Sequence, residues 1–242
     1  MGPVALITLP CPVLWAKASV TPGAFGLFQP DKVLPLNRFR RLLLRLGLPV
    51  TGKFRLNLSM PAGGGAGAST AALIALAQAA GASDRDAIIR AVLAEEGASD
   101  PLLFARAERL LWASRRGAVL AHLPSLPRFE VIGGFLGNGQ RTDALDHDFP
   151  DISDLLAKWP GASLPQMAQL ASHSARRTLA LRGPQDDPTE PLCHKTGALG
   201  FLIAHTGSAR GLIFAPGTVP DAAATDLRSA GFSQITRFRA GG

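Results

Sequence analysis

Hydrophobic and polar residues alternate over residues 54–59, where Phe54, Leu56 and Leu58 are separated by polar side chains. A repeat of two predicts a β-strand with one buried face. The segment 71–80 consists of Ala, Leu and Ile with a single Gln, which predicts a buried helix. Between them lie residues 61–70, a run of small residues with four glycines. This order predicts a strand, a glycine-rich loop and a buried helix in succession.

Other segments of the first half predict short strands and further helices. Proline and glycine punctuate the first fifty residues, a pattern typical of short strands joined by turns. Ser83, followed by Asp86 three residues later, predicts the start of a helix that continues to about residue 95. Residues 102–114 carry apolar side chains at helical spacing after Asp100 and Pro101, and we expect a third helix there.

The second half predicts a regular alternation of strands and helices. Expected strands cover residues 129–135, 200–204, 211–214 and 234–238, and expected helices begin near Ser163 and Asp221. Gln166 forms a capping box with Ser163. The resulting order, β-α-β-β-α-β, is that of a ferredoxin-like fold. We therefore expect an α+β protein with one domain over residues 1–125, a ferredoxin-like domain over residues 126–242, and a ligand cleft between them.

Composition narrows the class of protein. The chain has 242 residues, of which 47% are hydrophobic and 18% charged, enough for one large core or two smaller ones. No apolar run reaches the ~20 residues of a membrane-spanning helix, and the start lacks a secretory signal pattern, so we expect a cytoplasmic protein without a membrane partner. Cys11 and Cys193 are expected to be reduced thiols; Cys193, His194 and Lys195 are expected in a loop without metal-site spacing.

The formal net charge of +7 comes mainly from arginine. Arg38, Arg40, Arg41 and Arg45 alternate with Phe39 and leucines, which predicts a basic amphipathic helix. Such a helix either packs with its arginines in solvent or binds an anionic partner. The sequence has no helix-turn-helix pattern, no RNP aromatic motif and no tyrosine, which favours a packed helix and a small-molecule substrate over nucleic acid.

A glycine-rich turn between a strand and a helix can bind phosphate. The glycines let the backbone approach the ligand, and the N–H groups and dipole at the helix start attract negative charge. Ser69 and Thr70 lie where a hydroxyl can reach a phosphate or its Mg²⁺. The pattern is neither a Walker loop nor a Rossmann fingerprint. The alternative is structural, with small residues that only allow close packing of the helix on the sheet.

The loop resembles the phosphate loop of the GHMP small-molecule kinases, P-x-G-x-G-L-G-S-S-A. Here it reads Pro61-Ala62-Gly63-Gly64-Gly65-Ala66-Gly67-Ala68-Ser69-Thr70-Ala71, and its ending is similar to that of the bacterial L-threonine kinases of propanediol utilization and cobalamin biosynthesis. Residues 171–175 and 200–214 are similar to that branch's A-T-x-S-A helix and G-x-x-x-A-H-S-G-T-x-x-G-L-L-F hairpin. The resemblance implies the GHMP kinase architecture, an N-terminal half like ribosomal protein S5 domain 2 and a ferredoxin-like C-terminal half.

By this resemblance the cofactors are ATP and Mg²⁺, and each motif receives a role. The ATP-binding residues are expected to be Pro61, Gly63, Gly64, Gly65, Gly67, Ala68, Ser69 and Thr70, with Ser69 also on the metal side. The family's acidic E-P-T-D segment corresponds to Asp100 and, with a slip of one residue, Glu96; these carboxylates and Lys17 are the candidate catalytic residues. Contacts with the substrate are expected from His205, Thr206, Ser208 and Arg176. Asp100 has an alternative role as a helix cap, and His205 as a solvated turn residue.

The sequence therefore predicts ATP-dependent phosphorylation of a hydroxyl group on a small metabolite, with L-threonine or a similar hydroxy amino acid as the first candidate. Three departures leave a second hypothesis open: Lys17 replaces the family's Glu, Ala68 replaces Ser, and Ala72 replaces Asp. These changes remove oxygens that could bind Mg²⁺. The second hypothesis is a protein of the same fold that binds a nucleotide or metabolite without turnover. A nucleic-acid-binding role is a third and weaker hypothesis, because it rests on fold analogy alone. The sequence does not indicate an oligomeric state.

Overall fold

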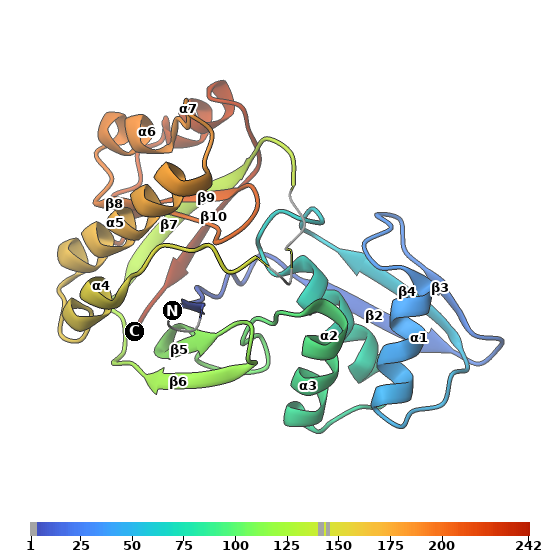
Figure 1. The fold of residues 1–242 in the computed structure, drawn as a ribbon. Coiled ribbons are helices and arrows are strands. Elements are labelled where there is room, and N and C mark those ends of the chain that lie inside the picture. Colours follow the sequence, from blue (N-terminus) through green and yellow to red (C-terminus); the bar gives the residue numbers. More distant parts are fainter. Residues whose placement is uncertain (1–3, 140–142, 144–145) are drawn as a thin grey trace.

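The computed structural model describes residues 4–139, 143 and 146–242, and it shows an α+β protein with three separate sheets. One sheet, of order β2-β4-β3, lies at the right of Figure 1. Its strands are β2 (Ala16–Thr21), β3 (Gly26–Phe28) and β4 (Lys53–Leu58), and three helices accompany them: α1 (Leu36–Arg45), α2 (Ala68–Ala79) and α3 (Arg85–Glu96). The predicted strand at 54–59, the buried helix and the basic amphipathic helix are confirmed.

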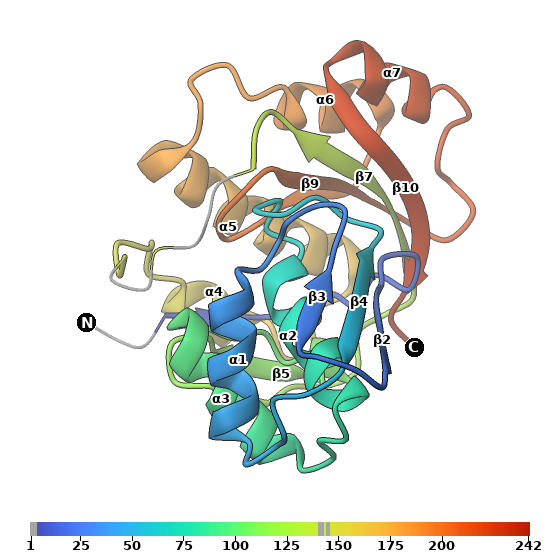
Figure 2. The same ribbon diagram turned by 90° about the vertical axis from the view of Figure 1, so that its right-hand side faces the viewer.

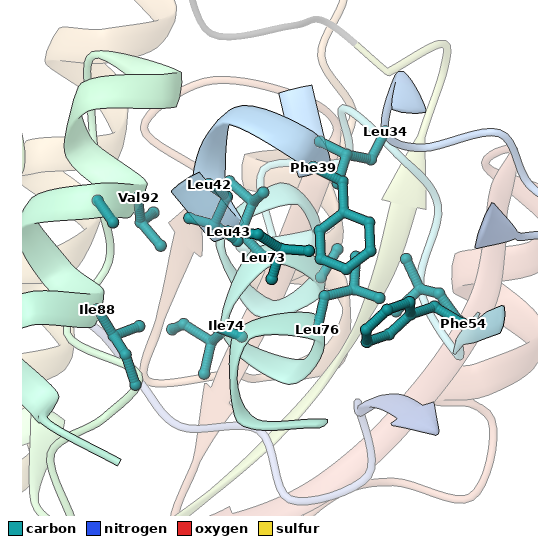
Figure 3. Close-up of a cluster of buried hydrophobic side chains, with 14 of the residues drawn as sticks. Leu34, Phe39, Leu42, Leu43, Phe54, Leu73, Ile74, Leu76, Ile88 and Val92 are labelled. Atoms are coloured by element: carbon teal, nitrogen blue, oxygen red, sulfur yellow. The ribbon is translucent and has the colours of Figure 1, made fainter. Parts of the chain in front are cut away.

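One apolar core joins this sheet to its helices (Figure 3). Phe39 of α1 meets Phe54 of β4 edge to face, with 4.7 Å between ring centroids. Leu73 and Leu76 of α2 lie in the same cluster and are fully buried. Helix α3 starts one residue later than predicted, because the side chain of Asp84, not Ser83, accepts the N–H groups of the first turn.

A second sheet corrects the prediction for residues 102–114. It consists of β1 (Ala5–Leu6), β5 (Leu110–Ala113) and β6 (Ala118–His122), in the order β1-β5-β6. The predicted third helix is wrong: a short 3-10 turn, η1 (Ala107–Arg109), leads into β5. Trp112 of β5 is fully buried, and its indole N–H donates to the carbonyl of Ser99 at 2.7 Å. Strand pairing and this burial outweigh the helical spacing. Because that helix does not form, the alternative role of Asp100 as its cap is also wrong.

The third sheet has the predicted ferredoxin-like order. Strands β7 (Phe129–Leu136), β8 (Gly200–Ile203), β9 (Ala209–Phe214) and β10 (Phe232–Ala240) form an antiparallel sheet of order β10-β7-β9-β8. Its helices are α4 (Ser153–Lys158), α5 (Leu164–Arg182), α6 (Thr189–Thr196) and α7 (Ala223–Ser229). Figures 1 and 2 show this part beside the first two sheets. The capping box of Ser163 and Gln166 opens α5 as predicted.

One smaller expectation about the second half is corrected. Cys193, His194 and Lys195 lie in helix α6, not in a loop, and the Cys193 side chain packs in the core of the third sheet. Between β7 and α4, Asp146 forms an ion pair with Arg182 of α5 at 2.5 Å. Among the described residues, no helix is long and apolar enough to cross a membrane.

Candidate functional site

The glycine loop connects β4 to α2 and has an unusual backbone. Gly63, Gly65 and Gly67 have φ angles of 73°, 77° and 71°, in the left-handed region that favours glycine. Gly67 occupies the N-cap position of α2 without a capping side chain. The sequence therefore uses glycine where the chain must turn sharply into the helix.

This backbone leaves a row of unpaired donors. Within the parts of the chain that the structure describes, the N–H groups from Gly65 to Thr70 have no hydrogen-bond acceptor, whereas Ala71 already donates to the carbonyl of Gly67. Six consecutive free N–H groups at the start of a helix form a site for an anion. Gly65, Ala66 and Gly67 line a cavity, so the first half of this row lies at the cavity wall.

The β8–β9 turn covers the other side of the glycine loop. The carbonyl of Gly64 accepts the N–H groups of Ser208 at 3.0 Å and of Ala209 at 2.8 Å. A Cβ on Gly65 would overlap the carbonyl oxygen of Thr206, and one on Gly207 would come within 2.5 Å of the carbonyl oxygen of Gly63. The two segments thus touch backbone to backbone, and this contact requires glycine on both.

A buried ion pair holds the turn in place. The guanidinium of Arg210 binds the carboxylate of Asp187 at 3.0 Å, and the two side chains are 7% and 4% exposed. The same guanidinium donates to the carbonyls of Gly207 and Ala209, each at 3.1 Å. Neither residue was singled out from the sequence. Arg210 falls at an unspecified position of the hairpin motif, and Asp187 precedes α6 with no local pattern that links it to the loop.

The candidate carboxylates lie at the start of α2. The Ser69 hydroxyl donates to the carboxylate of Glu96, which also binds Arg38 of α1 at 3.0 Å. Asp100 lies over Gly67 and accepts a hydrogen bond from the side chain of Thr70. Burial, and secondarily the negative charge of Glu96, raises the pKa of Asp100 to about 6. A carboxyl with that pKa can accept a proton near neutral pH.

A cavity of about 1000 Å³ opens in front of this group. Asp100, Gly65 and Gly67 line it on the loop side, and His205 and Arg210 line it on the hairpin side. Most of the remaining wall is apolar, for example Leu6, Leu126, Phe129, Trp159 and Met167. The described residues contain no group of three His, Cys, Asp or Glu side chains that could hold a metal ion by themselves.

His205 is packed against an aromatic ring. Its imidazole stacks on Phe149 with 3.9 Å between ring centroids and 11° between ring planes. Burial, with the positive charges of Arg115 and Arg182, lowers the pKa of His205 to about 4, so the ring is neutral at pH 7. The sequence expected either a substrate contact or a solvated turn residue. The partner, Phe149, was not singled out, because nothing near it in the sequence marks the contact.

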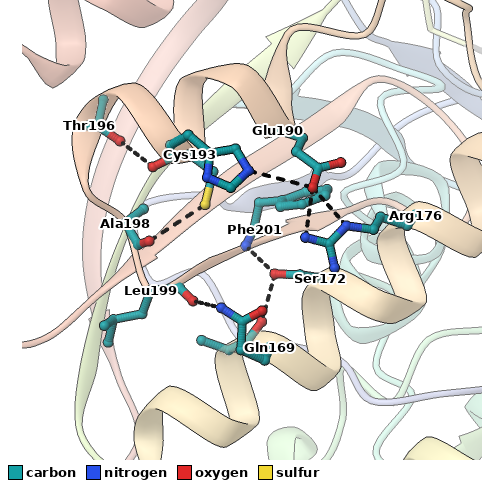
Figure 4. A network of polar contacts seen from close by, with 11 residues as sticks. Gln169, Ser172, Arg176, Glu190, Cys193, Thr196, Ala198, Leu199 and Phe201 are labelled. Carbon is teal, nitrogen blue, oxygen red and sulfur yellow. Dashed lines mark hydrogen bonds and ion pairs between the residues drawn. The ribbon is translucent and has the colours of Figure 1, made fainter.

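Two predicted site residues lie away from this group. Lys17 is exposed on β2, its ammonium 4.8 Å from the centre of the Trp15 ring, and it does not line the cavity. Figure 4 shows Arg176 of α5 turned toward Glu190 of α6, which it binds at 2.7 Å. Arg176 also does not line the cavity.

Comparisons of sequence find no relatives: no family model and no curated protein matches the chain. Comparison of structures does find similar proteins. Mevalonate kinase of L. major in complex with R-mevalonate is similar with a TM-score of 0.64 and 16% identity, over 94% of this chain and 86% of that chain. Homoserine kinase of Cytophaga hutchinsonii is similar with a TM-score of 0.52 and 19% identity, over 94% of this chain and 84% of that chain. A 4-(cytidine 5'-diphospho)-2C-methyl-D-erythritol kinase is similar with a TM-score of 0.51 and 21% identity, over 93% of this chain and 85% of that chain. These neighbours are kinases of the GHMP superfamily, and the fold expected from the sequence is confirmed.

Proposed function

We propose that this protein transfers the γ-phosphoryl group of ATP to a hydroxyl group of a small metabolite. The observation that carries the proposal is the row of six free N–H groups from Gly65 to Thr70 at the start of α2, whose first three residues line the cavity. Phosphoryl transfer depends mainly on positioning and on neutralising the charge of the phosphates. The kinase fold of the structural neighbours supports the same reaction class, and we keep the cytoplasm, where ATP is available, as the proposed compartment.

The residues present fit a nucleotide with Mg²⁺. The N–H groups of the loop would bind the phosphates, and Gly65, Ala66 and Gly67 bring three of these groups to the cavity wall. Mg²⁺ takes oxygen ligands and in kinases is held by one or two carboxylates together with the substrate's phosphates. The hydroxyl of Ser69 and the carboxylate of Glu96, already in contact, are the oxygens that would hold it. When bound, Mg²⁺ neutralises charge on the transferred group.

Asp100 is the proposed general base. Its carboxyl lies beside the loop at the cavity wall, and its raised pKa suits removal of a proton from an acceptor hydroxyl. His205, which is neutral and stacked on Phe149, lines the cavity on the hairpin side and would contact the acceptor there. Thr206 and Ser208 would act mainly through the backbone that meets the loop. We do not assign a role in catalysis to Lys17, which lies outside the cavity.

For the acceptor we propose L-threonine first and homoserine-like amino alcohols next, on the sequence resemblance described above. Propanediol utilization and cobalamin biosynthesis are the corresponding proposed contexts. A second candidate is a protein that binds the nucleotide without turnover. It is favoured by Ala68 and Ala72, which supply no oxygen to the start of α2.

The test is ATP consumption by the purified protein with Mg²⁺ against a panel of hydroxy amino acids, with nucleotide-induced thermal stabilisation measured in parallel. We expect turnover together with stabilisation. Asp100→Asn should keep the stabilisation and lose turnover, whereas Ser69→Ala should weaken both when Mg²⁺ is present. Stabilisation without turnover for any acceptor would favour the binding-only candidate. Absence of both responses would refute the site.

A further inference from the structure

The net charge of the protein is confined to the first third of the sequence. Residues 1–83 contain eight Lys and Arg but a single acidic residue, Asp31, whereas residues 84–242 contain 17 basic and 17 acidic residues. The whole formal charge of +7 therefore belongs to the segment that forms β2, β3, β4, α1 and α2. Such an asymmetry points to an anionic partner for this end of the molecule.

Three of the eight cations, all on α1, are neutralised within the protein. Arg41 and Arg45 each bind Glu95 at 2.8 Å, and Arg38 binds Glu96 at 3.0 Å. Most of the arginines of the basic helix α1 are thus paired with carboxylates of α3. In the part of the chain that the structure describes, the other five cations form no ion pair; they are Lys17, Lys32, Arg40, Lys53 and Arg55.

Three of these five lie on the outer face of the β2-β4-β3 sheet. Strand β4 exposes Lys53 and Arg55 and buries Phe54 and Leu56 against the helices. The register between β2 and β4 places Lys17 on the same outer face. In Figure 2 these strands lie in front of α2, which packs on their inner side. The outer face is therefore open to solvent.

Two exposed aromatic rings accompany the three cations. Phe28 of β3 is 56% exposed and pairs in register with Arg55, whose guanidinium lies 4.7 Å from the ring centre. Trp15, which precedes β2, is 41% exposed and lies under the ammonium of Lys17. The three strands contain no Asp or Glu. We call this surface the cation–aromatic face; it consists of Trp15, Lys17, Phe28, Lys53 and Arg55.

We propose that the cation–aromatic face binds single-stranded nucleic acid. Three positive charges without an acidic neighbour complement a row of phosphates, and exposed flat rings provide stacking surfaces for unpaired bases. An open sheet that presents aromatic side chains is also a geometry on which proteins bind single-stranded RNA. A second copy of this chain does not fit, because the two faces would bring like charges together. The proposal does not depend on the kinase activity. In the sequence, only the arginines of α1 and fold analogy suggested nucleic acid, and the sequence favoured a small-molecule substrate; the cation–aromatic face lies on the sheet instead.

The test is binding of a fluorescently labelled oligonucleotide of about 20 residues, oligo(U) or oligo(dT), to the full chain, followed by anisotropy between about 50 and about 200 mM salt. With three phosphate contacts, the logarithm of the affinity should fall with the logarithm of the salt concentration with a slope of about −2. Arg55→Glu and Phe28→Ala should each weaken binding about tenfold or more. The matched control is Arg228→Glu, which makes the same change of charge on the exposed side of α7 and should leave the affinity unchanged.

All three substituted side chains are exposed, so the variants should keep the melting temperature of the parent protein. Several results would overturn the proposal. One is no binding at about 50 mM salt. Another is an equal loss in Arg55→Glu and Arg228→Glu, which would mean unspecific attraction by net charge. Full displacement of the oligonucleotide by ATP would place it in the cavity instead. Binding to vesicles that contain phosphatidylserine, with no binding of oligonucleotide, would make the face a lipid-binding surface.

Discussion

Removal of the Asp187 carboxylate is the sharpest test of how the hairpin turn is held on the glycine loop. In Asp187→Ala, Arg210 would keep its bonds to the carbonyls of Gly207 and Ala209 but would lose its counter-charge in a buried place. Loss of one partner from a buried ion pair costs about 3–5 kcal/mol of the free energy of unfolding. For a protein of this size, about 1 kcal/mol corresponds to about 2–4 °C, so we expect the melting temperature to fall by about 6–20 °C.

The protein offers a matched control for this substitution. Arg177 and Asp154 form an ion pair at 2.7 Å in which the side chains are 37% and 53% exposed. Asp154→Ala removes the same chemical group from solvent-exposed surroundings, where an ion pair contributes little, and should lower the stability far less than Asp187→Ala. Urea unfolding of both variants measures the difference. Equal losses in the two variants would refute the assignment of Asp187 to a buried anchor.

Hydrogen exchange locates the effect. The N–H groups of Ser208 and Ala209, which donate to the carbonyl of Gly64, should exchange faster in Asp187→Ala at temperatures where the rest of the protein remains folded. The Asp154→Ala variant should leave both rates unchanged. Unchanged rates in Asp187→Ala, together with lower global stability, would mean that the pair stabilises the fold without positioning the turn.

Three further substitutions test other parts of the structure. Asp100→Asn should raise the melting temperature at pH 8 but not at pH 4. The pKa of about 6 makes ionisation of this carboxyl costlier in the folded state, and this cost develops as pH rises from about 4 to 6. An equal effect on the melting temperature at both pH values would contradict this reasoning. Gly65→Ala should lower the free energy of unfolding in urea by more than the ~1 kcal/mol of the left-handed backbone alone, because the new Cβ overlaps the Thr206 carbonyl; parental stability would contradict it. Glu130→Gln should destabilise the protein at pH 7, because two arginines of β10 lower the pKa of Glu130 to about 2. The difference in free energy of unfolding between parent and variant should shrink as pH falls from about 4.5 to 2. Chemical denaturation over this pH range measures the difference, and a constant value would refute the reasoning.

The elements that could be predicted correctly from the sequence are those whose local sequence patterns agree with their tertiary surroundings. Helix α5 has a capping box at Ser163 and an apolar face that packs against the third sheet, and both patterns predict a helix that begins at the same place. The glycine loop could be located because the period-two strand, the small residues and the apolar helix follow one another directly. Such agreement between levels is what makes a segment predictable.

The segment around β5 shows why other parts could not be predicted. Its apolar residues fit helical spacing, but the strands that pair with it, β1 and β6, include residues more than 100 positions earlier in the sequence. Likewise, no local pattern marks Asp187 as the partner of Arg210, or Phe149 as the partner of His205. Contacts of this kind depend on how distant segments meet, which spacing along the chain does not encode.

The contact between Gly64 and Ser208 joins residues that are 144 positions apart. During synthesis, the glycine loop leaves the ribosome well before the turn that covers it, by on the order of ten seconds at typical rates. The growing chain can already bury the core of α1, α2 and α3, but the Gly64 carbonyl has no partner until β9 follows. A truncated chain that keeps the entire N-terminal sheet and its helices would therefore fold around an unsupported loop, and the anion site would be completed only late in translation.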